Sequence, residues 1–334
     1  MIRRRRITAI MAALGVIVIL VVAIRLVSGG GGGSGAATGA AIAGTPIGSE
    51  SPVPGDTGTS AARPTTVGRS KARATGTTGL PSSAELAAMP GTGRPGTGSV
   101  PVLMYHVIAA PPPGAPFPGL YVTPDLFAAQ MHALQAAGWH GVTLDQMQAY
   151  WQRGVALPKG KPIVVTFDNG YQSQYTQALP VLRAMGWAAV ENIQLTGLPA
   201  SQGGFSAGQV KGLLAAGWEL DTQGFSHADL VKLSASDLHY QVAVARSVVQ
   251  KRWGVPVNWF CYPSGHYDAT VVAAVQAAGY EGSTTVVPGW AAPSSDPDRL
   301  PRLRVLGGTA PGTLLDQIAG IRGDSPPPAS YDPT

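Results

Sequence analysis

Residues 162–170 read PIVVTFDNG, an apolar run that ends in an acid and a turn signal. The run at 162–165 is short and rich in β-branched residues, which predicts a buried strand. Asn169-Gly170 predicts a tight turn, a dipeptide that is common after any strand. In α/β proteins with parallel strands, chemistry takes place at the carboxyl ends of the strands. Asp168 therefore stands where a catalytic group is expected.

Strand-like and helix-like segments alternate along the chain from residue 100 onward. Regular alternation predicts a parallel sheet with helical crossovers. About seven or eight strands suit a distorted (β/α) barrel, and an open doubly wound sheet is the alternative. Strands are expected at 100–105, 141–144, 162–167, 187–193, 218–221, 257–262, 281–286 and 303–306, and helices at 125–137, 145–151, 173–185, 206–216, 234–253, 269–278 and 313–321, with Asp145 as the cap of the second helix.

Composition divides the chain into four parts. Residues 29–98 are rich in Gly, Ala, Thr, Ser and Pro and hold few large apolar side chains. Such a segment cannot bury enough surface to offset chain entropy, which predicts a disordered linker. We expect a signal-anchor segment at 1–28, this linker, a folded domain at 99–323 and a disordered tail at 324–334. The domain is long enough to form one sizeable core.

The amino terminus has the pattern of a membrane anchor. Four arginines at 3–6 precede an apolar run at 7–24, and Arg25 follows it. The run is just long enough to span a bilayer, and the arginines favour a cytoplasmic amino end. A cleaved signal peptide is the alternative, but Arg25 stands where a small-residue cleavage site is expected. Both interpretations place the domain outside the cytoplasm, either on a single-pass membrane protein or secreted.

The net charge of +5 does not describe the folded domain. Residues 1–98 hold ten of the 23 basic and three of the 18 acidic residues, so 13 basic and 15 acidic residues remain and give −2. The basic character belongs to the amino-terminal part. We therefore expect no nucleic-acid-binding surface on the domain.

Further segments carry polar residues directly after predicted strands. Residues 218–230 read WELDTQGFSHADL, and residues 260–268 read FCYPSGHYD. With TFDNG, LMYH at 103–106 and RLRV at 302–305, they stand in the order of the motifs of a known family. The chain thus resembles the polysaccharide deacetylases, the carbohydrate esterase family 4-like proteins with a NodB homology domain. The resemblance covers about residues 100–306 and includes degenerate metal-binding motifs.

The resemblance implies a barrel enzyme that removes acetyl groups from a polysaccharide with a divalent metal, usually zinc. An Asp-Asp pair in that family supplies the catalytic base and one metal ligand, and two His four residues apart supply the others. Carried onto this chain, the base is Asp168, and the ligand positions are Asn169, Gln223 and His227. Neutral amides occupy two of these three positions, so we expect weak zinc binding or none.

The resemblance also implies a substrate cleft beside the Tyr-Pro-x-Gly loop. No His follows His266 in the sequence, so the family's late-loop acid has no evident counterpart. Trp290 is a candidate for stacking on a sugar, and Arg302 and Arg304 are expected to form ion pairs or to close the barrel end. The expected cleft residues are His106, Tyr262, Pro263, Gly265 and His266.

Two functional classes stay open from the sequence. The domain is either a membrane-tethered, extracytoplasmic hydrolase that removes N- or O-acetyl groups from a cell-envelope polysaccharide, or an inactive relative that binds glycan or a partner through the same cleft. Retention of Asp168 favours the first class, and the amides at Asn169 and Gln223 favour the second.

Overall fold

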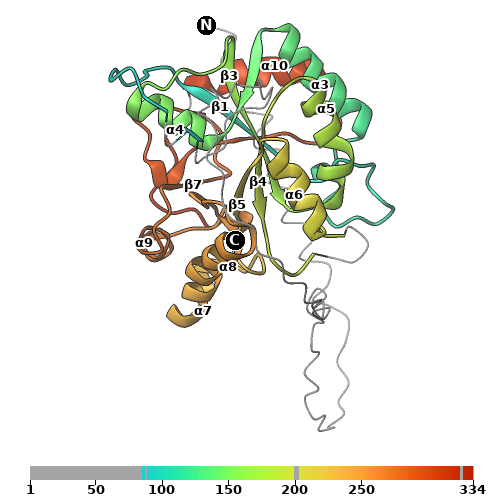
Figure 1. Cartoon of the computed structure of the whole chain (residues 1–334). Helices are drawn as coiled ribbons and strands as arrows, with labels where there is room; N and C mark the ends of the chain where they lie inside the picture. The colour runs from blue at the N-terminus through green and yellow to red at the C-terminus, as the bar shows by residue number, and fades with distance from the viewer. Residues whose placement is uncertain (1–84, 87–88, 199–202, 324–325, 334) are drawn as a thin grey trace, which may run out of the picture. The chain divides into compact units, whose positions relative to one another are not determined.

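The computed structural model describes residues 85–86, 89–198, 203–323 and 326–333 (Figure 1). The expected membrane anchor at 7–24 and the linker as far as residue 84 lie outside the described residues. Within the described ranges, every helix is too short or too polar to span a bilayer.

Nine strands of the described residues form one sheet, which is parallel except where β8 pairs with β1. The main path runs β7-β6-β5-β4-β3-β1-β8, with β2 beside β3 and β9 beside β1, and the sheet curls into a half-barrel (Figure 1). The strands are β1 (Val100–Tyr105), β2 (Trp139–Val142), β3 (Lys161–Asn169), β4 (Val190–Ile193), β5 (Glu219–Thr222), β6 (Trp259–Cys261), β7 (Gly282–Thr284), β8 (Trp290–Ala291) and β9 (Leu303–Arg304).

The predicted parallel α/β architecture is confirmed, with a curled half-barrel instead of a closed barrel. Strands β3 to β7 lie side by side in chain order, so the sheet is wound in one direction and the doubly wound alternative is wrong. Strand β8 was not predicted, because a strand of two residues has no periodicity to detect.

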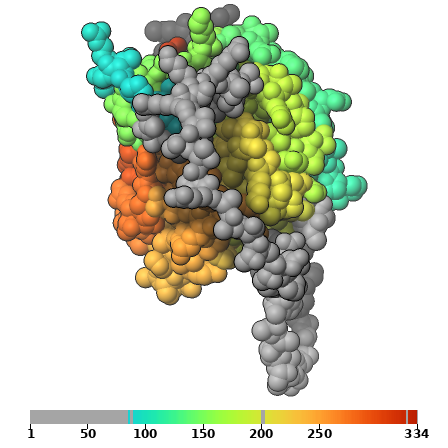
Figure 2. All heavy atoms as spheres, in the orientation of Figure 1, coloured from blue at the N-terminus to red at the C-terminus, as the bar shows by residue number. Residues whose placement is uncertain are grey.

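Helices pack around the outside of the sheet (Figure 1). In the space-filling view, α6 lies in the yellow region on one side and α7 to α9 in the orange region on the other (Figure 2). Two π-helical turns, at Gln174–Ala178 and Tyr240–Val244, interrupt segments that were predicted as continuous helices. The α-helices are α3 (Pro124–Ala136), α4 (Leu144–Arg153), α5 (Leu179–Ala184), α6 (Ala207–Ala215), α7 (Ala235–His239), α8 (Ala245–Trp253), α9 (Ala269–Ala277) and α10 (Pro311–Gly320).

Helix α4 starts at a different cap from the one expected. The Thr143 side chain accepts a hydrogen bond from the Gln146 N–H, and the Gln146 side chain accepts one from the Thr143 N–H, which forms a capping box. Asp145 is therefore not the cap. Its carboxylate accepts hydrogen bonds from Asn258 Nδ2 at 3.0 Å and from Trp259 Nε1 at 3.1 Å, and it ties α4 to the start of β6.

The amino-terminal boundary of the domain lies before residue 99. The Gly96 N–H donates to the Tyr150 carbonyl at 2.9 Å, and Arg153 Nη2 donates to the Leu86 carbonyl at 2.8 Å. A Cβ on Gly91 would lie 2.0 Å from the Arg153 carbonyl oxygen, and one on Gly96 would lie 2.2 Å from the Tyr150 ring. Glycine here allows close packing on α4, so a composition typical of a linker continues into the fold.

Residues 326–333, which fall within the predicted tail at 324–334, are hydrogen-bonded to the domain. Tyr331 and Tyr267 exchange backbone hydrogen bonds of 2.8 and 3.0 Å. The Tyr267 hydroxyl donates to the Pro328 carbonyl at 2.8 Å. Residues 326–333 therefore lie against the segment that follows β6.

Candidate functional site

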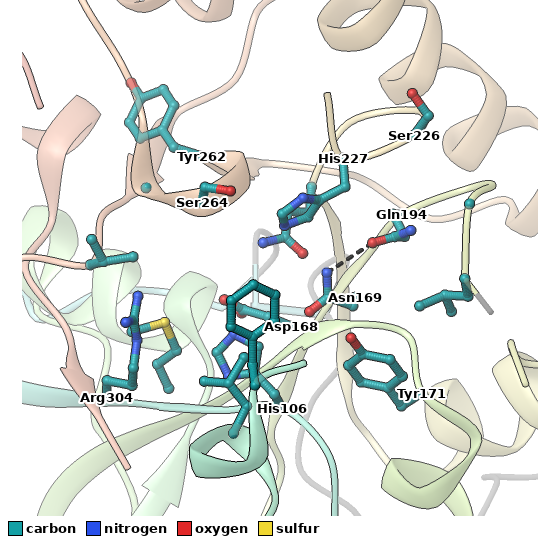
Figure 3. A pocket seen from close by; sticks show the side chains of 18 residues that line it. His106, Asp168, Asn169, Tyr171, Gln194, Ser226, His227, Tyr262, Ser264 and Arg304 are labelled. Atoms are coloured by element: carbon teal, nitrogen blue, oxygen red, sulfur yellow. Dashed lines mark hydrogen bonds between the residues drawn. The ribbon is translucent and has the colours of Figure 1, made fainter. Parts of the chain in front are cut away.

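A cleft of about 540 Å³ opens at the carboxyl ends of the parallel strands. Asp168 and Asn169 end β3, while His106, Gln194 and Gln223 directly follow β1, β4 and β5. Figure 3 shows His106, Asp168, Asn169 and His227 around a common space, to which different strands contribute. Strand ends that are far apart in sequence thus form one chemical environment.

Most of the residues that the sequence indicated lie together in this cleft. Pro263 does not line it but begins the 3₁₀ turn Pro263–Gly265, which presents Ser264 and Gly265 to the cleft. The predicted residues that line the cleft are His106, Asp168, Asn169, Gln223, His227, Tyr262 and Gly265.

His266 was expected in the cleft, but it does not line it. Its Nδ1 lies 3.2 Å from Asp229 Oδ1 and 3.5 Å from Asp332 Oδ1. The physical reason is the turn before it. Ser264 and Gly265 have φ values of 55° and 80°, and this left-handed turn carries the chain away from the cleft before His266.

Asp168 is held by a buried, bidentate ion pair. Arg302 Nη1 donates to Asp168 Oδ1 and Nη2 donates to Oδ2, both at 2.8 Å. Asn192 Nδ2 also donates to Oδ1, at 2.9 Å. Burial opposes ionisation of Asp168, but the Arg302 charge and its hydrogen bonds lower the pKa of Asp168 to about 2. The side chain is therefore a fixed carboxylate at neutral pH.

The Arg302 side chain is fully buried, but its guanidinium nitrogens all donate hydrogen bonds. Nε donates to the Thr285 carbonyl at 2.8 Å, and Nη1 donates to Thr166 Oγ1 at 2.9 Å. Nη2 also donates to the sulfur of Cys261, at 3.2 Å. This network fixes both groups of the ion pair, so their relative geometry is set before any ligand enters.

His106 lies at the cleft as a neutral imidazole. Burial lowers the pKa of His106 to about 4, although the Asp168 charge acts in the opposite direction. Its Nδ1 is buried and has no hydrogen-bond partner among the described residues. Gln174 Nε2 donates to the backbone carbonyls of both His106 and Asp168, each at 2.8 Å, so the two loops keep a fixed spacing.

The donors at the expected metal position do not fit zinc. Asn169 Nδ2 donates to Gln194 Oε1 at 2.8 Å (Figure 3), and Gln194 Nε2 donates to the Thr196 carbonyl at 2.8 Å. Gln223 is 2% exposed, and its Oε1 has no partner among the described residues. The described part of the chain contains no cluster of three His, Cys, Asp or Glu side chains that could hold a metal ion. Two neutral amides and His227 are a poor donor set for zinc.

Backbone strain is concentrated at the cleft. Three non-glycine residues of the described chain have positive φ: Asn169 at 83°, His227 at 55° and Ser264 at 55°. All three line the cleft. Such conformations are unfavourable for residues other than glycine, and they cluster where function requires a particular geometry.

Arg302 forms an ion pair, as the sequence suggested, whereas Trp290 does not have its suggested role. Arg302 was expected in an ion pair or at the barrel end, but its partner Asp168, 134 residues away, could not be identified from local patterns. Trp290 was a candidate sugar platform, but it pairs with Pro101 at the start of β1, and its Nε1 donates to the Ile318 carbonyl at 2.7 Å. It therefore packs near the amino end of β1, away from the strand ends that form the cleft.

Comparisons with known proteins agree with the motifs and the fold. Residues 157–283 match the family model for polysaccharide deacetylases. The protein YxkH of Bacillus subtilis (strain 168), which is named as a polysaccharide deacetylase, is 25% identical over 223 residues. The match covers 66% of this chain and 77% of that protein. Poly-beta-1,6-N-acetyl-D-glucosamine N-deacetylase of Escherichia coli (strain K12) is 42% identical over 57 residues, which are 17% of this chain and 8% of that protein.

A solved structure has a similar fold. The Streptococcus pyogenes deacetylase PplD, determined in complex with acetate, superposes with a TM-score of 0.61 and 25% identity. The match covers 66% of this chain and 99% of that chain. The ordered motifs, the curled parallel sheet and these similarities identify a polysaccharide deacetylase domain in the described part of the chain, with the family match at residues 157–283.

Proposed function

We propose that this domain binds an acetylated cell-envelope polysaccharide in the cleft and does not deacetylate it by a zinc-dependent route. The observation that carries the proposal is the donor set at the family's metal position. Asn169 and Gln223 supply neutral amides there, and the Asn169 amide N–H is already bonded to Gln194. Losing one group that supports a metal ligand typically costs about 10–100-fold in affinity, and two ligands themselves are changed here.

The polar atoms of the cleft support a retained ligand site. Gln223 Oε1 and His106 Nδ1 are buried without partners among the described residues, and both side chains line the cleft. Unsatisfied buried polar atoms are costly, so a ligand that supplies the missing hydrogen bonds binds favourably. Sugar hydroxyls and acetamido groups offer both donors and acceptors. The strained backbone at Asn169, His227 and Ser264 is a second reason to infer a maintained site.

The relatives suggest the class of glycan. The Escherichia coli relative is named for poly-beta-1,6-N-acetyl-D-glucosamine. We extend that class, an N-acetylated envelope glycan, to this chain as its ligand. The cleft is mainly apolar with a few convergent polar groups, as is common in sites for small ligands.

Hydrolysis without the family's zinc site is the second candidate function. The observation in its favour is that Asp168 and His106 both line the cleft, with their backbones joined through Gln174. Asp168 would accept a proton from the attacking water and return it to the leaving group as the bond to the acetyl carbon breaks, while the neutral His106 would act as a hydrogen-bond partner. A carboxylate whose pKa lies at about 2 is a weak base at neutral pH, so any turnover by this route should be slow.

We also propose that residues 7–24 anchor the protein in the cell membrane, with the domain on the extracytoplasmic side. The support is the length of the apolar run and the arginines before it. Fractionation of cells that express the full chain should recover it in the membrane fraction, accessible to external protease. Recovery of a shortened soluble protein outside the cells would favour signal cleavage instead.

The functional test compares the full chain with the double variant Asn169→Asp/Gln223→His. Metal content and acetate release from an N-acetylated oligosaccharide are measured with and without added zinc. We expect the unmodified chain to bind the oligosaccharide with no zinc-dependent acetate release, and the double variant to take up zinc. Stoichiometric zinc in the unmodified chain, with acetate release that Asp168→Ala abolishes, would refute the proposal.

A further inference from the structure

Phe117 is the most exposed large apolar side chain of the described residues, at 69%, and it lines the cleft. A second exposed apolar side chain, Leu306 at 44%, lies beside Gly119 in the same turn, where a Cβ on Gly119 would be 3.9 Å from Leu306 Cδ2, but Leu306 itself does not line the cleft. Met89 and Tyr240 are the other exposed large apolar residues in the described ranges, and neither lines the cleft. The cleft thus has an apolar lip beside its polar floor.

The backbone of Phe117 is fixed before any ligand enters. Pro116 and Pro118 flank it, and it caps the 3₁₀ turn Pro118–Leu120. The Leu120 N–H donates to the Phe117 carbonyl at 3.0 Å. Proline restricts the backbone on both sides of the residue, so little conformational entropy is lost when the ring becomes ordered against a ligand.

The turn that carries Phe117 is also tied to the strand ends of the cleft. The Val107 N–H, next to His106, donates to the Leu120 carbonyl at 3.2 Å. The Gly307 N–H donates to the Gly119 carbonyl at 2.8 Å, which joins the turn to the chain after β9. The Phe117 backbone therefore has a set position relative to His106 and Arg304, which both line the cleft.

Packing within the domain does not account for this phenylalanine. Phe117 is not part of the buried core clusters, and no ring-to-ring contact involves it among the described residues. Pyranose rings present faces of C–H groups that pack on aromatic rings, while their hydroxyls and acetamido groups need polar partners. A polar floor with a rigid aromatic group at the lip matches both parts of such a ligand.

We propose that Phe117 is a stacking platform for the pyranose ring next to the sugar whose acetamido group enters the cleft. This inference rests on the proposed glycan-binding function and adds a residue that selects for chain length. A single sugar would occupy the floor, at His106 and Gln223, without reaching Phe117. An oligosaccharide would contact both, so Phe117 favours polymeric over monomeric ligand.

The test measures affinities of the full chain for N-acetylglucosamine and for its β-1,6-linked pentamer by calorimetry. Phe117→Ala should weaken pentamer binding by about five- to tenfold and change monomer binding by less than about twofold. Phe117→Trp should keep pentamer binding. The matched control is Tyr240→Ala, which removes an exposed aromatic outside the cleft and should leave both affinities unchanged.

Three outcomes would overturn the inference in distinguishable ways. If the unmodified chain binds neither sugar, the proposed function fails and the inference fails with it. If it binds the pentamer and Phe117→Ala binds equally well, only the platform is wrong. If Phe117→Ala abolishes self-association in sedimentation experiments and leaves pentamer affinity unchanged, the occupant of the lip is a second copy of the chain.

Discussion

Asp168 and Asp221 are two buried carboxyl groups in one row of the sheet, aligned through Asn192 on the strand between them. They are 1% and 0% exposed, respectively. The pKa of Asp168 falls to about 2, whereas the pKa of Asp221 rises to about 7. Equal burial in one sheet therefore gives opposite ionisation behaviour.

The neighbours of the two groups explain the difference. Burial raises the pKa of each carboxyl, but Asp168 faces the fixed cation of Arg302, which reverses the effect. For Asp221, the Asp145 charge adds to burial and raises the pKa, and the side-chain hydrogen bond with Glu219 and the hydrogen bonds that its Oδ1 accepts from the Asn258 and Trp259 N–H groups, at 3.0 and 2.9 Å, lower the pKa only in part. One location keeps a permanent anion at the cleft, and the other holds a carboxyl that keeps its proton up to about pH 7 and helps to join β5 and β6.

The largest expected effect comes from removing the cation. Arg302→Met leaves Asp168 buried without its counter-charge, and we expect a loss of about 3–5 kcal/mol in the free energy of unfolding, measured in urea at pH 7. Adding Asp168→Asn to this variant should recover part of the loss, because no isolated charge then remains. A loss below about 1 kcal/mol in the single variant would show that Arg302 does not control Asp168.

The pH dependence of stability should carry opposite contributions from the two groups. Between its ordinary pKa of 3.8 and about 7, Asp221 keeps its proton in the folded state and loses it in the unfolded state. Its contribution to stability therefore falls as pH rises through this window, by at most about 1.4 kcal/mol per pH unit. Asp168 acts in the other direction: its contribution is lost as pH falls from 3.8 towards 2.

The variant Asp221→Asn isolates that first contribution. Its amide oxygen can still accept from the Asn258 and Trp259 N–H groups, so the fold should persist. Denaturant unfolding at several pH values from 4 to 7 should give a shallower decline in stability with pH than in the unmodified chain. An unchanged slope would mean that Asp221 is ionised in the folded protein at neutral pH.

The smallest expected effect on stability comes from backbone strain. The cleft contains non-glycine residues with positive φ, and the described region around Asp221 does not. Ser264 has a φ of 55° and is exposed, so Ser264→Gly should relieve strain and stabilise the fold by about 0.5–1 kcal/mol in thermal or urea unfolding. Ser264→Ala keeps the same backbone and is the control, with no gain expected. Equal stability of the two variants would indicate that the turn is not strained.

Local patterns in the sequence were enough to place all the described strands except β8, and the residues at their ends. Asp168 and Asn169 follow an apolar run, and parallel strands bring such ends together, which is why most of the predicted cleft residues meet. The ion pair between Asp168 and Arg302 depends on the closure of the whole sheet across 134 residues, and no local pattern encodes it.

The sequence-based predictions also differ from the structure where one residue type occurs in two structural settings. Glycines at 91 and 96 have the composition of a linker, but their lack of a side chain permits close packing on α4. Trp290 had the character of a sugar platform and lies at the amino end of β1, whereas Phe117, which drew no attention in the sequence, lines the cleft. Exposure and position, which depend on tertiary structure, separate these two aromatic residues.

In the proposed function, the cleft recognises an acetylated glycan with amide groups in place of a metal ion. The most direct measurement is the calorimetric affinity of the full chain for an N-acetylated oligosaccharide, first after removal of metal with a chelator and then with zinc restored. We expect the same affinity in both states. Binding that appears only after zinc is restored would contradict the proposed function.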